Sequence, residues 1–354
     1  MTLSLTSLLT KSSKCGIIIL GNYINNQHFK YNKEERDNIM PFAIDNYITD
    51  LEICQADYLD KIKERKKMHS EYIGTYAEAL RQSGKSEQQI ARAEICGNYI
   101  KVSDNGEIQT INTCKNRLCI ICAWKLSRKV FRDTMLMLDY LKEREYKYIF
   151  LTLTVKNVPG EKLTEQINQL NAGYKRLYER KRFKAFSKGT IKNIEITYNE
   201  KKNTFHGHIH AIIAVDKDYF TTQGKYISQQ EIRRLWEKSA RLDYKSQVDI
   251  RKIDDDDSGA VAECSKYAVK LSNLYKVKNH EKRVSAIKTM IMATYHRRLH
   301  TLSQCFKEAA QHLDIKDYES EDDELKGVIN ETDKIFEWTP GINTYTETNW
   351  IETV

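Results

Sequence analysis

Three histidines alternate along one apolar segment, and this pattern constrains the fold more than any other feature of the chain. The segment FHGHIHAIIAV covers residues 205–215, with histidines at 206, 208 and 210. In a β-strand, side chains two residues apart lie on the same face, about 6.6 Å from each other. The three imidazoles therefore point the same way if the segment is a strand. Because the outer two would be about 13 Å apart, one ion needs two neighbouring histidines and a ligand from elsewhere.

The preceding segment offers such a ligand. In residues 192–198 (KNIEITY), the isoleucines occupy one face and Glu195 the other. If the hairpin register sets Glu195 opposite His208 or His210, a site with two imidazoles, one carboxylate and open positions results, whereas a one-residue slip turns Glu195 away. We predict that two of the three histidines His206, His208 and His210, together with Glu195, bind Mn²⁺ or Mg²⁺. The alternative is that these histidines are ordinary surface or core residues.

A second group of metal ligands flanks a predicted hairpin. The pattern C-x4-C-x2-C comprises Cys114, Cys119 and Cys122, and Cys96 lies upstream. Residues 95–111 alternate around Asp-Asn-Gly, which is typical of two strands joined by a tight turn. Closing this hairpin would bring four thiolates together as a tetrahedral Zn²⁺ site. The alternative is a set of buried free cysteines, because the first pair is spaced C-x17-C.

From residue 146 onward, strand and helix patterns follow one another. Period-two patterns predict strands at 148–155, 191–198, 205–215 and 247–253, and helical spacing predicts helices at about 163–186, 228–242 and 258–274. Strands joined by both hairpins and helical crossovers indicate an α+β fold with a central mixed or antiparallel sheet and helices on one side.

The charge of the chain is distributed unevenly. The net charge is +8, yet residues 313–354 hold twelve Asp and Glu against three Lys, a net of −9, which leaves 8 − (−9) = +17 on residues 1–312. A basic body suits a polyanion such as nucleic acid, although it can also serve solubility alone. No apolar stretch approaches the roughly 20 residues of a membrane helix, and residues 1–14 lack a secretory signal. We therefore expect a cytoplasmic protein.

The predicted helix at 258–274 carries three reactive side chains. Glu263, Tyr267 and Lys270 are spaced i, i+4 and i+7, which places them on one stripe. A tyrosine can act as a covalent nucleophile when a metal-bound phosphodiester is the electrophile. The alternative is an amphipathic helix with a Glu/Lys pair around a packed tyrosine.

Taken together, the strings FLTLTVKN, FHGHIHAIIAV and ECSKYAVK resemble the three motifs of rolling-circle replication initiators of small bacterial plasmids, a group within the HUH endonucleases. The segments CKNRLCIICAW and LWEKSARLDYKSQVDI are also similar to the single-tyrosine plasmid branch of that group. The resemblance covers roughly residues 90–310. The pattern departs at Gly207 and at Ile120-Ile121, where relatives often have Pro, and neither change touches a chemical group.

The resemblance implies an HUH-type fold, with a ferredoxin- or RRM-like antiparallel sheet, and a nickase that acts on the plasmid's double-strand origin. His208 and His210 would be metal ligands. Tyr267 would attack the scissile phosphate to give a 5′-phosphotyrosine and a 3′-OH primer, Glu263 would activate water for the terminating cleavage, and Lys270 would stabilise the phosphotyrosine. Origin DNA is the expected partner, in a bacterial cytoplasm, with a host helicase, a polymerase and a second copy of the chain as further candidates.

These patterns predict four regions and leave alternative functions open. The regions are an N-terminal helical region at 1–93, the cysteine module with a basic helix at 94–145, the catalytic domain at 146–312 and an acidic C-terminal tail at 313–354. A relaxase or single-tyrosine transposase would use the same histidine pair. A non-catalytic zinc-dependent DNA-binding regulator would leave the histidines idle, and a two-histidine, one-carboxylate iron oxygenase would not use Tyr267.

Overall fold

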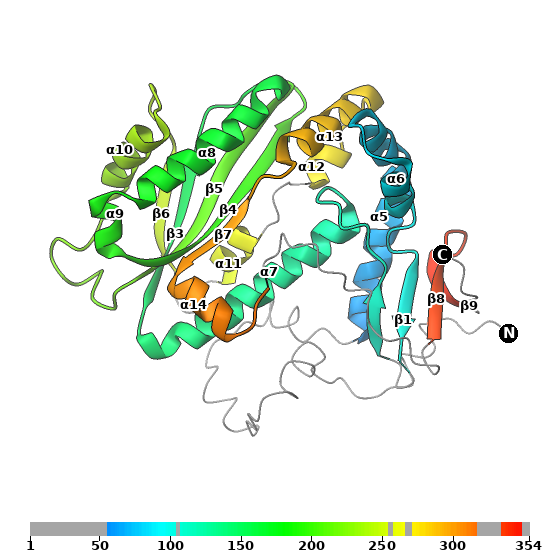
Figure 1. The fold of residues 1–354 in the computed structure, drawn as a ribbon, viewed down its shortest axis with the longest axis horizontal. Coiled ribbons are helices and arrows are strands. Elements are labelled where there is room, and N and C mark those ends of the chain that lie inside the picture. The colour runs from blue at the N-terminus through cyan, green and yellow to red at the C-terminus, as the bar shows by residue number, and fades with distance from the viewer. Residues whose placement is uncertain (1–54, 104–106, 254–257, 266–270, 317–333, 349–354) are drawn as a thin grey trace. The chain divides into compact units, whose positions relative to one another are not determined.

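The computed structural model describes residues 55–103, 107–253, 258–265, 271–316 and 334–348 (Figure 1). Its contacts divide the chain into two compact units, which we describe separately. The first comprises Met1–Ala77, Lys85–Trp124 and Glu321–Val354, and the second comprises Glu78–Gly84 and Lys125–Ser320. In the described part of the chain, no helix combines the length and the apolar character needed to cross a membrane.

The second unit is built on a five-stranded sheet with the strand order β6-β3-β5-β4-β7, in which all neighbours are antiparallel. The strands are β3 (Lys147–Thr154), β4 (Ser187–Asn199), β5 (Thr204–Val215), β6 (Val248–Ile253) and β7 (His300–Gln304). Strands β4 and β5 form a hairpin whose turn ends at Asn203, a residue with φ of 48°. The expected α+β class and its central antiparallel sheet are thus confirmed.

Helix α8 (Leu163–Tyr178) covers the face of this sheet that points away from the histidines. Its apolar residues Ile167, Leu170 and Leu177 are buried, and its Gln166 carboxamide oxygen accepts a hydrogen bond of 2.8 Å from the Gly207 N–H. Helix α10 (Gln229–Ala240) packs on α8 at Gly173, where an added Cβ would lie 3.0 Å from the Cα of Ala240. The absence of a side chain at Gly173 therefore allows the two helices to approach closely.

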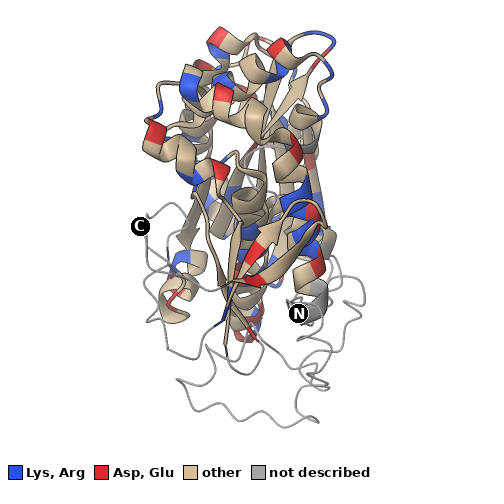
Figure 2. Ribbon diagram, turned by 90° about the vertical axis from the view of Figure 1, so that its right-hand side faces the viewer, with Lys and Arg blue, Asp and Glu red and all other residues tan. Residues whose placement is uncertain are grey.

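The predicted helix at 163–186 ends earlier than expected, at Tyr178. Three of the arginines in this segment form hydrogen bonds or ion pairs within the protein. A separate helix, α9 (Lys181–Phe186), begins after Arg180, whose backbone is extended. Arg176 donates to the Ser239 carbonyl, Arg180 to the Ser239 hydroxyl at 2.6 Å, and Arg182 pairs with Glu231 at 2.8 Å. Along the helices, basic and acidic residues are interspersed (Figure 2). Several of these basic side chains therefore hold α8 and α9 to α10 and its flanking residues.

The other face of the sheet is apolar beyond the histidines. Phe150, Ile191 and Ile212 share the face of His208 and His210, because they occupy alternate positions in paired strands. They form one buried cluster with residues of α7 (Ile120–Tyr140), α11 (Ser258–Ser265) and α14 (Cys305–His312). Further helical segments of this unit are η1 (Leu141–Arg144), η2 (Gly160–Lys162), α12 (Leu271–Tyr275) and α13 (His280–Thr294).

The first unit contains a four-stranded sheet with the order β2-β1-β8-β9. The predicted hairpin around residue 105 is present as β1 (Tyr99–Val102) and β2 (Ile108–Ile111). This unit also contains α5 (Gln55–Gln82), which runs across the division between the units, and α6 (Glu87–Glu94), whose N-terminus is held by a capping box at Ser86.

The expectation that residues 313–354 form a solvated tail is wrong for part of this segment. Strand β8 (Lys334–Thr339) pairs with β1, and β9 (Thr344–Thr348) pairs with β8. Phe336 and Tyr345 are fully buried, so this hairpin belongs to the core of the first unit. Within this acidic segment, residues 336–338 (FEW) and 344–346 (TYT) alternate apolar and polar side chains, which is the pattern of a strand.

Candidate functional site

The register of the β4–β5 hairpin places Glu195 directly opposite His208. Asn193 lies opposite His210, and Thr197 lies opposite His206. Directly opposed residues in an antiparallel pair project from the same face, so Glu195 joins the histidines. This register is one of the two, Glu195 opposite His208 or opposite His210, that the sequence pattern requires for a two-histidine, one-carboxylate group.

The three side chains converge on one point. A single Glu195 carboxylate oxygen, Oε2, lies 2.9 Å from His208 Nε2 and 3.1 Å from His210 Nε2. All three candidate ligand atoms lie within 4.8 Å of one another. Glu195 is only 5% exposed. Burial raises the pKa of Glu195, but hydrogen bonds to His208 and His210 outweigh burial and hold this pKa well below its usual value. The carboxylate is therefore charged at neutral pH.

Neighbouring side chains fix the orientation of His210. Its Nδ1 lies 3.2 Å from the Thr152 hydroxyl, and its ring stacks on Phe150 with a centroid separation of 5.5 Å. If Nδ1 carries the proton and donates it to Thr152, Nε2 keeps its lone pair for a metal. Thr152 was not singled out as a site residue from the sequence, although the alternation of residues 148–155 already placed it on one face of a strand.

His206 lies outside the converging group. Its ring centroid is 5.3 Å from that of His208, and it is not among the three residues whose ligand atoms converge. Burial, followed by the charge of His208, lowers the pKa of His206.

The donor set fits a divalent cation. Two imidazole nitrogens and one carboxylate oxygen suit first-row divalent ions, and three protein ligands leave coordination positions open for a substrate oxygen. The Nδ1 of His208 is buried without a hydrogen-bond partner in the described part of the chain, so only its Nε2 faces the group.

Helix α11 packs against the histidine strand. The Cys264 thiol lies 3.8 Å from the backbone oxygens of both His210 and Ile191. Glu263 belongs to this helix and precedes Cys264. The two remaining predicted site residues, Tyr267 and Lys270, fall in 266–270, outside the described residues.

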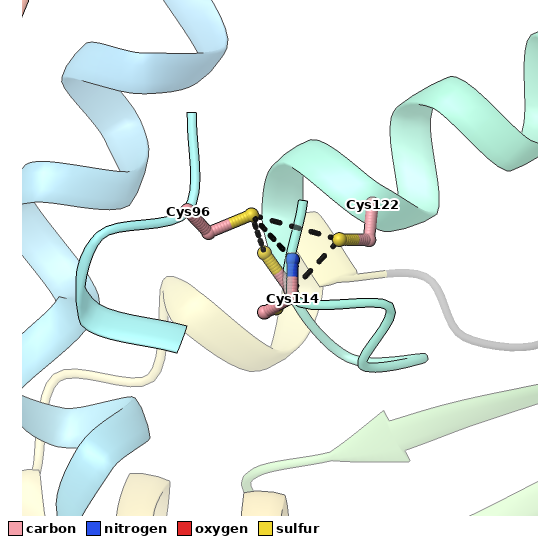
Figure 3. Close-up of side chains that lie close together, drawn as sticks. Cys96, Cys114 and Cys122 are labelled. Atoms are coloured by element: carbon pink, nitrogen blue, oxygen red, sulfur yellow. Dashed lines mark hydrogen bonds between the residues drawn. The ribbon is translucent and has the colours of Figure 1, made fainter. Parts of the chain in front are cut away.

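The four cysteines lie together in the first unit. Figure 3 labels three of them, Cys96, Cys114 and Cys122. Cys96 follows α6, Cys114 follows β2, Cys119 precedes α7, and Cys122 lies in the first turn of α7. The sulfur of Cys122 is 3.6 Å from those of Cys96 and Cys114, and that of Cys119 is 3.5 Å from Cys96. These distances are far longer than a disulfide bond.

The spacing of the sulfurs fits a zinc ion. Four sulfurs at 2.3 Å from one Zn²⁺ would lie about 3.8 Å apart, close to the separations found here. Hydrogen bonds from the thiols of Cys114, Cys119 and Cys96 lower the pKa of Cys122, whereas the hydrogen bond with Cys114 raises the pKa of Cys96 and burial raises that of Cys119. The backbone N–H of Cys114 also points to the Cys96 sulfur at 3.3 Å. The four sulfurs therefore lie where one metal ion could bind them all.

Comparison with known proteins places the chain among replication proteins. The sequence model of the family Rep_1, described as "Replication protein", matches residues 105–346. A "Protein rep" of Streptococcus pneumoniae serotype 2 (strain D39 / NCTC 7466) is 33% identical over 70% of this chain and 78% of its own length. For a "Protein rep" of Staphylococcus aureus the identity is 36%, over 53% and 84%, and for one of Bacillus amyloliquefaciens it is 34%, over 66% and 75%.

No solved structure matches the chain. The family match contains every predicted site residue except Cys96, because it begins at residue 105. The relatives and the family model agree with the resemblance that the three motifs carry. The chain therefore belongs to the replication protein family Rep_1, the family of plasmid rolling-circle replication initiators.

Proposed function

We propose that this protein starts plasmid replication by nicking one strand of the double-strand origin through metal-assisted attack by a tyrosine. The observation that carries the proposal is the convergence of Glu195, His208 and His210 on one face of the sheet. The packing of α11 against the backbone of His210 supports it, because the chain continues from this helix to Tyr267.

His208, His210 and Glu195 would hold the catalytic Mn²⁺ or Mg²⁺. When bound, the ion would polarise an oxygen of the scissile phosphate. The low pKa of Glu195 keeps its carboxylate ionised, and the Thr152 hydroxyl holds the His210 ring in place. These residues thus provide a charged and oriented ligand set before the substrate arrives.

The nicking step assigned to Tyr267 conserves the phosphodiester energy. Its phenolic oxygen forms a bond to phosphorus while the bond from phosphorus to the 3′ oxygen breaks. The tyrosine loses its proton, and the departing 3′ oxygen gains one to become the primer hydroxyl. Lys270, three residues further along the sequence, would stabilise the negative charge of the 5′-phosphotyrosine.

Glu263 would act in the terminating cleavage. As a general base it would take a proton from water, and the water oxygen would bond to the phosphorus at the regenerated nick site. The bond from that phosphorus to the 3′ oxygen would break, leaving a 5′-phosphate and, once the 3′ oxygen is protonated, a 3′-OH. This avoids a second covalent protein–DNA complex. We also propose that the four cysteines hold a structural Zn²⁺ that stabilises the unit to which they belong.

The substrate would be origin DNA presented as a single strand or an extruded hairpin, since a side chain must reach the backbone of one strand. The net charge of +17 on residues 1–312 would give salt-dependent affinity for that DNA. The work would take place in the bacterial cytoplasm, with a host helicase and polymerase acting after the nick.

The test is a search for a covalent protein–DNA complex. The purified protein and its Tyr267→Phe variant are incubated with labelled single-stranded oligonucleotides, hairpins and supercoiled plasmid in the presence of Mn²⁺. We expect a denaturation-resistant band with the wild type only, carrying the DNA fragment 3′ of the nick. A Tyr226→Phe variant is the matched control, because Tyr226 is 53% exposed and lies in a different segment.

The outcomes separate the candidate functions. A band that forms equally with Tyr267→Phe would contradict the assigned nucleophile. No band with folded, metal-loaded protein on any of the three substrates would favour a non-catalytic DNA-binding regulator. A band on an unrelated transfer origin, but none on a plasmid replication origin, would favour a relaxase.

A further inference from the structure

Lys66 is a buried cation next to the cysteine cluster. It lies in α5, is only 2% exposed, and its ammonium donates a hydrogen bond of 2.9 Å to the carbonyl oxygen of Cys96. In the described part of the chain, no carboxylate forms an ion pair with it. A buried charge with a single neutral hydrogen-bond partner is costly unless an opposite charge lies nearby.

The hydrogen bond from Lys66 to the Cys96 carbonyl oxygen places its ammonium beside one of the four candidate zinc ligands. Four thiolates with one Zn²⁺ carry a net charge of −2, so a single ammonium reduces the charge of the group to −1. The buried position of Lys66 is therefore understandable when the cluster holds its metal.

The side chain of Lys66 also borders the turn that carries Cys96. A Cβ placed on Gly97, whose φ is +70°, would lie 3.5 Å from Lys66 Cδ. On the same turn, the Tyr345 hydroxyl donates a hydrogen bond of 2.6 Å to the Gly97 carbonyl oxygen. Two segments distant in sequence, α5 and β9, thus hold the turn of the one cysteine that lies outside the C-x4-C-x2-C run.

We propose that Lys66 is a positioning residue of the zinc site, whose positive charge stabilises the zinc tetrathiolate and ties α5 to it. The inference rests on the zinc site proposed above. Outer residues that orient and balance metal ligands commonly change metal affinity by 10- to 100-fold. The N-terminal helix is then part of the metal site, and zinc binding and the docking of α5 favour each other.

The experiment measures zinc affinity by competition with a chromophoric chelator, on full-length protein. Lys66→Met removes the charge, Lys66→Gln removes the charge but keeps a hydrogen-bond donor, and Lys66→Arg keeps the charge. The matched control is Lys67→Met, the exposed neighbour on the same helix. We expect affinity to fall about tenfold or more for Met and Gln, to recover at least partly for Arg, and to stay within about twofold for the control.

A second measurement distinguishes charge balance from simple packing. In the metal-free protein, Lys66→Met should unfold at the same or a higher urea concentration than wild type, because an uncompensated buried charge has been removed. In the zinc-loaded protein the order should reverse. Equal zinc affinity of wild type and Lys66→Met, or lower stability of that variant in both states, would overturn the inference. If wild type itself binds no zinc, the proposed zinc site fails first.

Discussion

Glu195 and His208 face each other across strands β4 and β5, and the oxygen that lies 2.9 Å from His208 Nε2 lies 3.1 Å from His210 Nε2 as well. One carboxylate oxygen thus serves both imidazoles. This arrangement depends on the register of a single hairpin. The site therefore forms only when the β4–β5 turn folds with this register.

Replacing Glu195 by Gln should abolish tight metal binding. The change removes the one negative charge among the three candidate ligands, so Mn²⁺ affinity should fall by more than about a hundredfold, beyond the effect of outer residues. Calorimetric titration with Mn²⁺ measures this directly. Glu200→Gln, an exposed residue in the turn of the same hairpin, should bind Mn²⁺ as wild type does. Unchanged affinity of Glu195→Gln would exclude this carboxylate as a ligand.

Thr152 and Thr154 provide a matched pair for testing the orientation of His210. The Thr152 hydroxyl lies 3.2 Å from His210 Nδ1, whereas the Thr154 hydroxyl donates to the Gln247 carbonyl oxygen at 2.9 Å. Thr152→Val should therefore weaken Mn²⁺ binding roughly tenfold, and Thr154→Val should not. Both variants keep the β-branched shape that suits a strand. Equal effects of the two substitutions would show that the hydroxyl of Thr152 does not position the imidazole.

Part of this site follows from the sequence. Period-two alternation places His206, His208 and His210 on one face whatever their surroundings, because strand geometry alone decides it. The partner of Glu195 does not follow, since a slip of two residues would keep every side chain on its face and pair Glu195 with a different residue. The turn ending at Asn203, with its positive φ, and the pairing of β4 with β7 on its other side fix the register.

In the fold as well, features set by neighbouring residues can be predicted from the sequence, whereas contacts between distant segments cannot. A serine three residues before a glutamate is a local signal for the start of a helix, and the Ser228 hydroxyl accepts a hydrogen bond from the Glu231 N–H at 3.1 Å at the start of α10. The pairing of β8 with β1 joins residues more than two hundred positions apart, which no local pattern specifies. The burial of Lys66 is not predictable for a similar reason: within a charged helix, nothing in the sequence marks one lysine as buried.

Tyr345 should be important for the stability of the cysteine module. Its buried hydroxyl donates a hydrogen bond of 2.6 Å to the Gly97 carbonyl oxygen. Tyr345→Phe would leave that buried oxygen without this donor, and the free energy of unfolding should fall by about 1–3 kcal/mol. Urea denaturation measures the change, with Tyr226→Phe as the exposed control. A loss no larger than that of the control would mean that the hairpin is held by apolar packing alone.

Removing the Zn²⁺ proposed for the cysteine cluster should affect the first unit most. Chelation of Zn²⁺, or Cys114→Ser, would remove the link between the β1–β2 hairpin and the start of α7. We expect hydrogen exchange to accelerate in residues 96–122 and in β8 and β9, which pair with β1, and to change little in β3, β4 and β5. Cys305→Ser, in a cysteine outside the cluster, is the comparison. Equal acceleration in all strands would indicate that the metal stabilises the chain as a whole.

His69 should make the protein less stable in mild acid. Burial, followed by the charge of Lys66, lowers the pKa of His69 to about 4, against 6.5 for an unperturbed histidine. A lowered pKa means that the unfolded chain binds the proton first, so stability is complete above pH 6.5 and is lost as the pH falls toward 4. Between pH 7 and pH 5, the free energy of unfolding of wild type should fall by about 2 kcal/mol more than that of His69→Leu.

Urea unfolding at both pH values, with each protein in the same zinc state, measures the difference. His280→Gln, in an exposed histidine, should behave like wild type. If wild type and His69→Leu lose stability in parallel, His69 does not cause the acid sensitivity.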